Sequence, residues 1–122
     1  MLDIGAMGLL VPFVKSVDEV KQVIEYGKFV PIGQRGFGPG RMSGFGLLPE
    51  FSSIADYFET CNRETLIIPQ CETVEALECI QEIAGLEGVD GTFVGPLDLS
   101  IAMGKPLQFN DPEFISAVER TV

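Results

Sequence analysis

Two segments decide the fold that the sequence predicts: TLIIPQCET at residues 65–73 and TFVGPLDLS at residues 92–100. Each begins as a short apolar run and then changes to polar or acidic residues. Between them, apolar residues recur at the spacing of one helix face over residues 74–84. Short apolar runs of this kind are typical of strands in parallel sheets, which are covered on both faces. We therefore predict a strand–helix–strand unit with a right-handed crossover.

The same alternation continues on both sides of this unit. Ser16 is a candidate N-cap with Glu19 three residues later, and a helical pattern follows it as far as Gly27. The Gly- and Pro-rich segment 31–49 is longer than an ordinary connection, which is typical of functional or mobile loops. The order predicts an α/β fold of parallel βα units. We expect strands at residues 8–14, 66–70 and 91–94, and helices at residues 17–27, 54–61, 74–84 and from Pro112 to the chain end, capped by Asn110 or Asp111.

Three strands are too few for a complete domain of this class. A parallel sheet has to be buried on both faces, and its two edges have to be paired or covered. A closed βα-barrel uses eight strands in about 250 residues. We therefore expect residues 1–122 to form a single, incomplete segment of a larger α/β architecture.

The composition excludes several classes of partner. Eighteen Asp and Glu residues against eight Lys and Arg residues give a net charge of −10, which argues against nucleic acid and against an anionic membrane surface. No apolar run reaches the roughly 20 residues of a membrane span, and no basic region precedes the first apolar run. Cys61, Cys71 and Cys79 lack the spacing of a disulfide or zinc framework, so we predict reduced thiols in a cytoplasmic protein. The absence of His excludes an imidazole base within this chain.

Polar side chains follow two strands that we expect to be neighbours. Gln70 and Glu72 lie two residues apart, so they point to the same side of the strand, and Cys71 points away. Asp98 follows the next strand, about 4.8 Å from the first. Since ligands bind at the carboxyl ends of parallel strands, we predict that Glu72 and Asp98 converge and share a cation. Carboxylate oxygens suit Mg²⁺ or Mn²⁺, and such an ion polarises a carbonyl group.

Two other interpretations of these carboxylates stay open on the sequence alone. Glu72 precedes a helix and Asp98 precedes Ser100, so each could cap a helix or a turn. The two could also form a general acid/base pair.

Four motifs, in order along the chain, resemble the HpcH/HpaI family of aldolases. They are LDIGAMGLLVP at 2–12, PIGQRGFGPGR at 31–41, PQCETVEAL at 69–77 and GVDGTFVGPLDLS at 88–100. The resemblance implies a (β/α)₈ barrel, a homo-oligomer and metal-dependent cleavage of 4-hydroxy-2-oxo acids to pyruvate and an aldehyde. It implies a divalent cofactor, Mg²⁺ or Mn²⁺, with Co²⁺ and Zn²⁺ as further candidates.

The resemblance also assigns roles to residues. Glu72 and Asp98 match the metal ligands, Gln70 matches a residue near the bound 2-oxo acid, and the main-chain N–H of Leu97 matches a donor to the substrate carboxylate. Arg35 belongs to a loop at the edge of the family's active site, with a structural salt bridge as the alternative role. The family's His–Asp base and its Arg have no counterpart here, so we assign no catalytic residue and expect weak or no turnover from this chain alone.

Two alternative functions remain after this assignment. A citrate-lyase-β or malyl-CoA type of lyase shares the barrel and the Glu/Asp pair, but it acts on CoA thioesters and favours a basic surface for the CoA phosphates. A non-catalytic half-barrel that pairs with copies of itself through its open edges is the alternative outside the enzymes.

Overall fold

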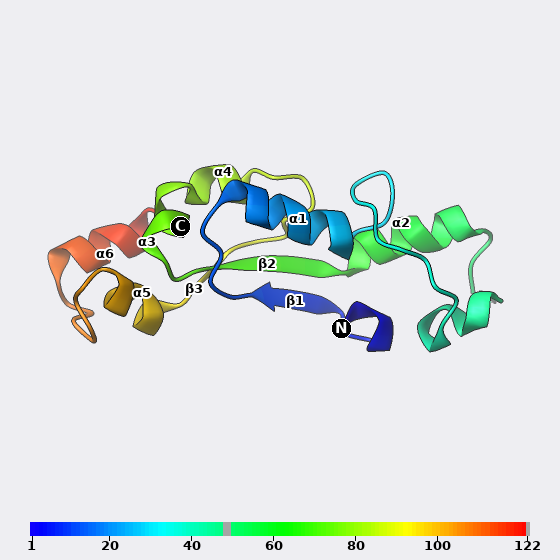
Figure 1. Cartoon of the computed structure of the whole chain (residues 1–122), viewed down its shortest axis with the longest axis horizontal. Helices are drawn as coiled ribbons and strands as arrows, with labels where there is room; N and C mark the ends of the chain where they lie inside the picture. Colours follow the sequence, from blue (N-terminus) through cyan, green and yellow to red (C-terminus); the bar gives the residue numbers. More distant parts are fainter. Residues whose placement is uncertain (48–49, 122) are drawn as a thin grey trace.

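The computed structural model describes residues 1–47 and 50–121, with Met42 described by its main chain only. Three strands form one parallel sheet in the order β1-β2-β3 (Figure 1). They are β1 (Gly8–Val11), β2 (Leu66–Cys71) and β3 (Phe93–Val94). Consecutive strands are neighbours, so the predicted α/β fold with parallel strands is confirmed. The sheet is open, and a closed barrel stays a prediction.

Helices cover one face of the sheet, and further helices lie beyond both ends of its strands. Helices α1 and α4 lie over one face, α2 extends past the amino ends of the strands, and α5 and α6 lie past the carboxyl ends (Figure 1). The described elements are η1 (Leu2–Ile4), α1 (Val17–Gly27), η2 (Arg41–Gly46), α2 (Ile54–Glu64), α3 (Val74–Glu78), α4 (Ile80–Ala84), α5 (Pro96–Ala102) and α6 (Pro112–Glu119).

The helix starts follow the predicted caps. Ser16 Oγ accepts the Glu19 N–H at 3.3 Å at the start of α1. Asp111 Oδ1 accepts the N–H of Glu113 at 2.9 Å and that of Phe114 at 3.2 Å at the start of α6. These bonds satisfy N–H groups that have no partner inside the helix.

The structure differs from the predicted elements in one strand end, one interrupted helix and one additional helix. The first strand ends at Val11 rather than at residue 14, because Phe13 adopts the left-handed conformation with φ 52° and turns the chain. The helix expected over residues 74–84 is interrupted at Cys79, which has non-helical dihedral angles and separates α3 from α4. The short helix α5 was not predicted, and it contains Asp98.

The expected loop 31–49 and the last helix also differ from their predicted extents. The loop includes the 3₁₀ element η2, and its residues Leu48 and Pro49 lie outside the described residues. Helix α6 ends at Glu119 rather than at the chain end, and Val122 is likewise outside the described part.

The core lies between the sheet and the helices. On β2, Ile67 and Cys71 are fully buried and face α1, whose Val20 and Ile24 pack against them. The other members are apolar side chains of α3 to α6 and of the turn after β1: Val14, Ala76, Leu77, Ile80, Ile83, Leu99, Phe114 and Ala117. Burial of this set provides the main driving force for folding of the segment.

The opposite face of the sheet is uncovered and apolar. Leu10 is 51% exposed, Leu66 is 44% exposed and Phe93 is 48% exposed, and all three lie on alternate strand positions to the core residues. Gln70 lies on this same face, opposite Phe93 in the register. Parallel sheets are normally covered on both faces, so this apolar face, which no described element covers, is unusual for the class.

The amino end of the sheet is held by a buried Lys. Lys28 is 2% exposed, and its ammonium group donates to the Asn62 carbonyl at 2.8 Å, to the Thr65 carbonyl and to Asp90 Oδ2 at 3.3 Å. Asp90 Oδ2 also accepts the Ile67 N–H at 2.8 Å. Three acceptors around one ammonium group compensate the loss of hydration that burial costs it.

We predict that Lys28→Met lowers the free energy of unfolding by about 2–4 kcal/mol, because it leaves two carbonyls and a carboxylate without their donor. Lys21→Met is the matched control, since Lys21 is exposed and pairs only with Asp18 at 3.4 Å. Urea unfolding followed by circular dichroism measures both variants. Equal stability of the two would show that the buried ammonium group does not hold this end of the sheet.

Candidate functional site

All four predicted site residues lie at or just beyond the carboxyl ends of β2 and β3. The register pairs Cys71 with Val94, so that Glu72 is level with Gly95, and the Gly95 N–H donates to the Cys71 carbonyl at 3.1 Å. Gly95 is also the N-cap of α5, which begins with Pro96. The polar end of β2 is therefore joined directly to the start of the helix that carries Leu97 and Asp98.

The side chains of Gln70 and Glu72 converge over Gly95. A Cβ atom at position 95 would lie 2.6 Å from Glu72 Oε2 and 2.8 Å from Gln70 Nε2, so only glycine leaves room for both. Cys71 is fully buried in the core, where burial raises the pKa of its thiol to about 11. The prediction that residues 70 and 72 share one side and residue 71 faces the other is confirmed.

The carboxylate of Glu72 is almost excluded from solvent. Its side chain belongs to a residue that is 2% exposed, and Oε1 accepts the main-chain N–H of Phe13 at 2.7 Å. No Lys or Arg within residues 1–47 and 50–121 forms an ion pair with it. A buried carboxylate costs free energy unless charge or hydrogen bonds compensate it, so this group is suited to binding a cation.

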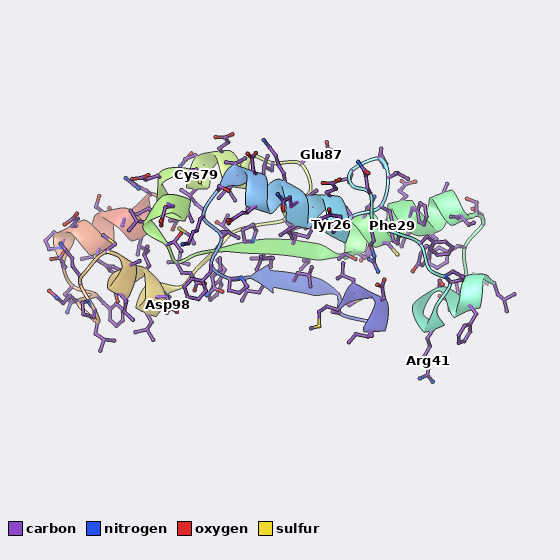
Figure 2. All side chains as sticks on the ribbon, viewed as in Figure 1. Tyr26, Phe29, Arg41, Cys79, Glu87 and Asp98 are labelled. Carbon is purple, nitrogen blue, oxygen red and sulfur yellow. The ribbon has the colours of Figure 1, made fainter. Side chains whose placement is uncertain are left out.

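Asp98 lies in the first turn of α5 and is half-buried (Figure 2). It is three residues beyond Gly95, over which Glu72 Oε2 lies. Leu97 precedes it, and the N–H groups of this first turn have no partner within the helix. That Glu72 and Asp98 share a cation stays a prediction.

The capping interpretation of the two carboxylates is wrong. Thr73, not Glu72, caps α3, because Thr73 Oγ1 accepts the Ala76 N–H at 3.0 Å. Asp98 is inside α5, whose N-cap is Gly95 and which has no side-chain cap. Neither carboxylate therefore caps a helix, which is the structural role that its position in the sequence had suggested.

The donor set fits a hard cation. The predicted ligands are carboxylate oxygens, which are groups that Mg²⁺ and Mn²⁺ prefer. No group of three or more Asp, Glu, Cys or His residues in the described part of the chain is placed to hold a metal. Two carboxylates would leave the other coordination positions to water and substrate.

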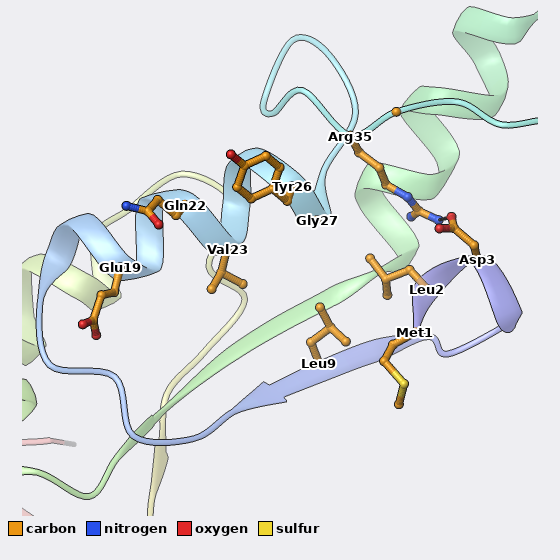
Figure 3. Close-up of a pocket in the computed structure, with 11 residues that line it drawn as sticks. Met1, Leu2, Asp3, Leu9, Glu19, Gln22, Val23, Tyr26, Gly27 and Arg35 are labelled. Atoms are coloured by element: carbon orange, nitrogen blue, oxygen red, sulfur yellow. Dashed lines mark hydrogen bonds and ion pairs between the residues drawn. The ribbon is translucent and has the colours of Figure 1, made fainter.

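Arg35 lies at the other end of the sheet. Its Nη2 atom is 2.6 Å from Asp3 Oδ1 (Figure 3). Its guanidinium carbon is 4.6 Å from the centroid of the Phe29 ring. Asp3 precedes β1, so this ion pair is at the amino ends of the strands, opposite to Glu72. The structure therefore supports the structural salt bridge that was the alternative role for Arg35.

One cavity of the described surface is separate from the candidate site. An open cavity of about 700 Å³ lies between α1 and the free edge of β1, and Arg35 and Asp3 border it (Figure 3). Its floor and walls come from Leu9 and from one flank of α1, including Val23 and Tyr26. None of the predicted site residues lines this cavity. The cavity lies beside the edge strand β1, at a distance from the carboxyl ends of the strands.

Two residues of the site were not found from the sequence. Gly95 carries a weak signal, since a glycine before Pro96 is a common way to begin a helix. Phe13 carries none, because its contribution is a main-chain N–H directed at a residue 59 positions away. Long-range contacts of this kind depend on the fold and cannot be read from local patterns.

The family model described as HpcH/HpaI aldolase/citrate lyase matches residues 1–122. A hydroxypyruvate/pyruvate aldolase from Sagittula stellata is 38% identical over 118 residues, which cover 97% of this chain and 45% of the relative. A 4-hydroxy-2-oxo-heptane-1,7-dioate aldolase from Escherichia coli is 35% identical over 122 residues, which cover 100% of this chain and 45% of the relative. The chain thus spans less than half the length of these curated relatives.

Solved structures share the fold. An HpcH/HpaI aldolase from Desulfitobacterium hafniense superposes with a TM-score of 0.83 at 32% identity, over 98% of this chain and 45% of that one. A citrate synthase superposes with a TM-score of 0.83 at 31% identity, over 98% of this chain and 43% of that one. The helices among the described residues are too short and too polar to cross a lipid bilayer.

We predict that Gly95→Ala displaces Gln70 and Glu72 and lowers the free energy of unfolding by about 1–3 kcal/mol, because the added methyl group overlaps both side chains. Gly91→Ala is the matched control: its Cβ meets open space, so stability should change by less than about 1 kcal/mol. Urea unfolding compares the two. A Gly95→Ala chain as stable as the control would contradict the close approach.

Proposed function

Because this chain belongs to the HpcH/HpaI aldolase/citrate lyase family, we propose that it forms part of a metal-dependent aldolase that cleaves 4-hydroxy-2-oxo acids to pyruvate and an aldehyde. The observation that carries this proposal is the buried Glu72 carboxylate, which has no ion-pair partner in the described residues and lies beside the start of α5. Ligand sites of parallel α/β sheets lie at this end of the strands.

Glu72 and Asp98 would hold the cation in this proposal, and Mg²⁺ or Mn²⁺ fits their oxygens best, with Co²⁺ or Zn²⁺ as further candidates. A bound divalent ion would supply Lewis-acid stabilisation of the negative charge that develops on a carbonyl oxygen when the carbon–carbon bond breaks. Glu72 is buried, where the effective dielectric constant is lower than in water. Its charge therefore acts on neighbouring groups more strongly than it would in water.

Gln70 and Leu97 would bind the 2-oxo acid. The Gln70 amide lies over Gly95 beside Glu72, and in this proposal it would donate to a carboxylate or carbonyl oxygen of pyruvate. The N–H of Leu97, in the first turn of α5, is a second donor to the substrate carboxylate. Both groups orient the substrate, and neither moves a proton.

Proton transfer requires groups that this chain does not carry. The sequence has no His, and the resemblance implies a His–Asp base and an Arg that its 122 residues do not match. We propose that residues 1–122 are a single, incomplete segment of a (β/α)₈ barrel and that the bare sheet face is part of the barrel interior. The proposal places the complete enzyme in the cytoplasm as a homo-oligomer.

The alternatives are supported less well. Five of the eight Lys and Arg residues are engaged in ion pairs, and the net charge is −10, so a surface for CoA phosphates is not favoured. The uncovered apolar face would also let a non-catalytic half-barrel associate with a copy of itself, but this face is equally accounted for as barrel interior. Metal binding distinguishes that module from the aldolase segment.

Calorimetric titration with Mn²⁺ tests the proposal. We expect one ion per chain, with an affinity that Glu72→Gln and Asp98→Asn each lower by at least tenfold, since even outer partners of metal ligands contribute about 10–100-fold. Glu75→Gln is the control, because Glu75 is an exposed carboxylate in the first turn of α3. Equal heats of Mn²⁺ binding in all four proteins would refute the metal site and would leave the non-catalytic half-barrel as the remaining function.

We also predict that this chain alone forms pyruvate from a 4-hydroxy-2-oxo acid at a rate near background, because it lacks a base at the reacting carbon. A coupled lactate dehydrogenase assay measures pyruvate release. Turnover comparable to that of a full-length relative would show that the 122 residues contain the proton-transfer groups.

A further inference from the structure

The turn that follows β1 contacts Glu72 through its main chain. We propose that this turn is a positioning device: the N–H of Phe13 holds Glu72 Oε1, so that Oε2 is the oxygen presented to the cation. The inference rests on the proposed function to the extent that Glu72 is a metal ligand. It assigns a role to Phe13 that is independent of its side chain.

The hydrogen bond from the Phe13 N–H to Glu72 Oε1 has the length and burial of a strong contact. The distance from Phe13 N to Glu72 Oε1 is 2.7 Å, in the range of charge-assisted bonds, and the acceptor residue is 2% exposed. Water therefore competes little for this oxygen. A bond of this kind restricts the Glu72 side chain to one orientation.

Phe13 adopts a costly conformation to make this contact. Its φ of 52° is in the left-handed region, which is uncommon for a residue with a bulky side chain. The side chain gains nothing evident from it, since Phe13 is 61% exposed. Strained residues cluster at functional sites, where the surrounding structure holds them in place.

A second bond fixes the same turn to the end of β2. Thr73 Oγ1 donates to the Val14 carbonyl at 2.9 Å, and Val14 itself is buried in the core. Phe13 and Val14 are thus tied to Glu72 and Thr73 by two adjacent bonds, one in each direction. The turn is a rigid support rather than a loose loop over the site.

Gly95 completes the arrangement from the other side. Glu72 Oε2 lies 2.6 Å from the position that a Cβ of residue 95 would occupy, so this oxygen faces the junction of β3 and α5. Asp98 is in the first turn of α5. One oxygen of the carboxylate is therefore taken by the turn, and the other faces the element that carries the second predicted ligand.

The experiment removes the N–H and keeps everything else. Phe13 is replaced by phenyllactic acid through nonsense suppression, which converts the amide N–H to an ester oxygen. We expect Mn²⁺ affinity to fall about 10–100-fold, as for other outer partners of metal ligands, and the Mn²⁺ electron paramagnetic resonance spectrum to change. Phe13→Gly keeps the N–H and suits a positive φ, so it should bind Mn²⁺ within about threefold of the unaltered chain.

Phe45 in η2 provides a matched control. It is also a Phe with a positive φ, 56°, and an exposed side chain, and its N–H donates to the Gly40 carbonyl at 2.8 Å. The same amide-to-ester change at Phe45 should leave Mn²⁺ affinity unchanged. An equal loss at both positions would show a general effect of the ester and would overturn the proposal.

A second measurement does not require the ester to fold. The Phe13 amide proton should be protected from hydrogen exchange in the unaltered chain and should lose protection in Glu72→Ala. An unprotected amide, or a Phe13 ester that binds Mn²⁺ normally, would overturn the positioning role while leaving the metal site intact. Failure of the unaltered chain to bind Mn²⁺, or normal binding by Glu72→Gln, would instead refute the proposed function.

Discussion

The buried carboxylate of Glu72 is the constraint on which the rest of the candidate site depends. A charge that is 2% exposed has to be compensated, and the chain brings one hydrogen bond to it, from the Phe13 main chain. That bond and the adjacent one from Thr73 Oγ1 to the Val14 carbonyl hold the turn after β1 against the end of β2. Gly95 has to be glycine because the same carboxylate and the Gln70 amide occupy the space above it. The ends of all three strands are thus arranged around one side chain.

The two ends of the sheet have different roles. The amino end contributes to the stability of the fold, and the carboxyl end carries the candidate site. At the amino end, Lys28 is surrounded by acceptors, and Arg35 pairs with Asp3 against the Phe29 ring. Both cations are thus paired with groups of the fold at that end of the sheet. At the carboxyl end, Glu72 and Asp98 lack such partners among the described residues. This division is the one that parallel α/β architectures show in general.

Local signals in the sequence predicted most of the fold and part of the site. Apolar runs located β2 and β3, and hydroxyl or carboxylate caps located the starts of α1, α3 and α6. The period of two placed Gln70 and Glu72 on one side of β2, as the structure confirms. Helix α5 was not predicted because its seven residues follow a strand directly and give no separate periodic pattern. The early end of β1 was not predicted because it depends on the left-handed conformation of Phe13, and the Phe13 contact was not predicted because Glu72 is 59 positions away.

Crystals of the chain grown with Mn²⁺ would test the central claim most directly, through the position of the anomalous scattering peak. The account predicts one peak within coordination distance, about 2.1 Å, of both Glu72 Oε2 and a carboxylate oxygen of Asp98, with Oε1 still bound to the Phe13 N–H. A peak elsewhere, or Glu72 and Asp98 too far apart to contact the same ion, would contradict it.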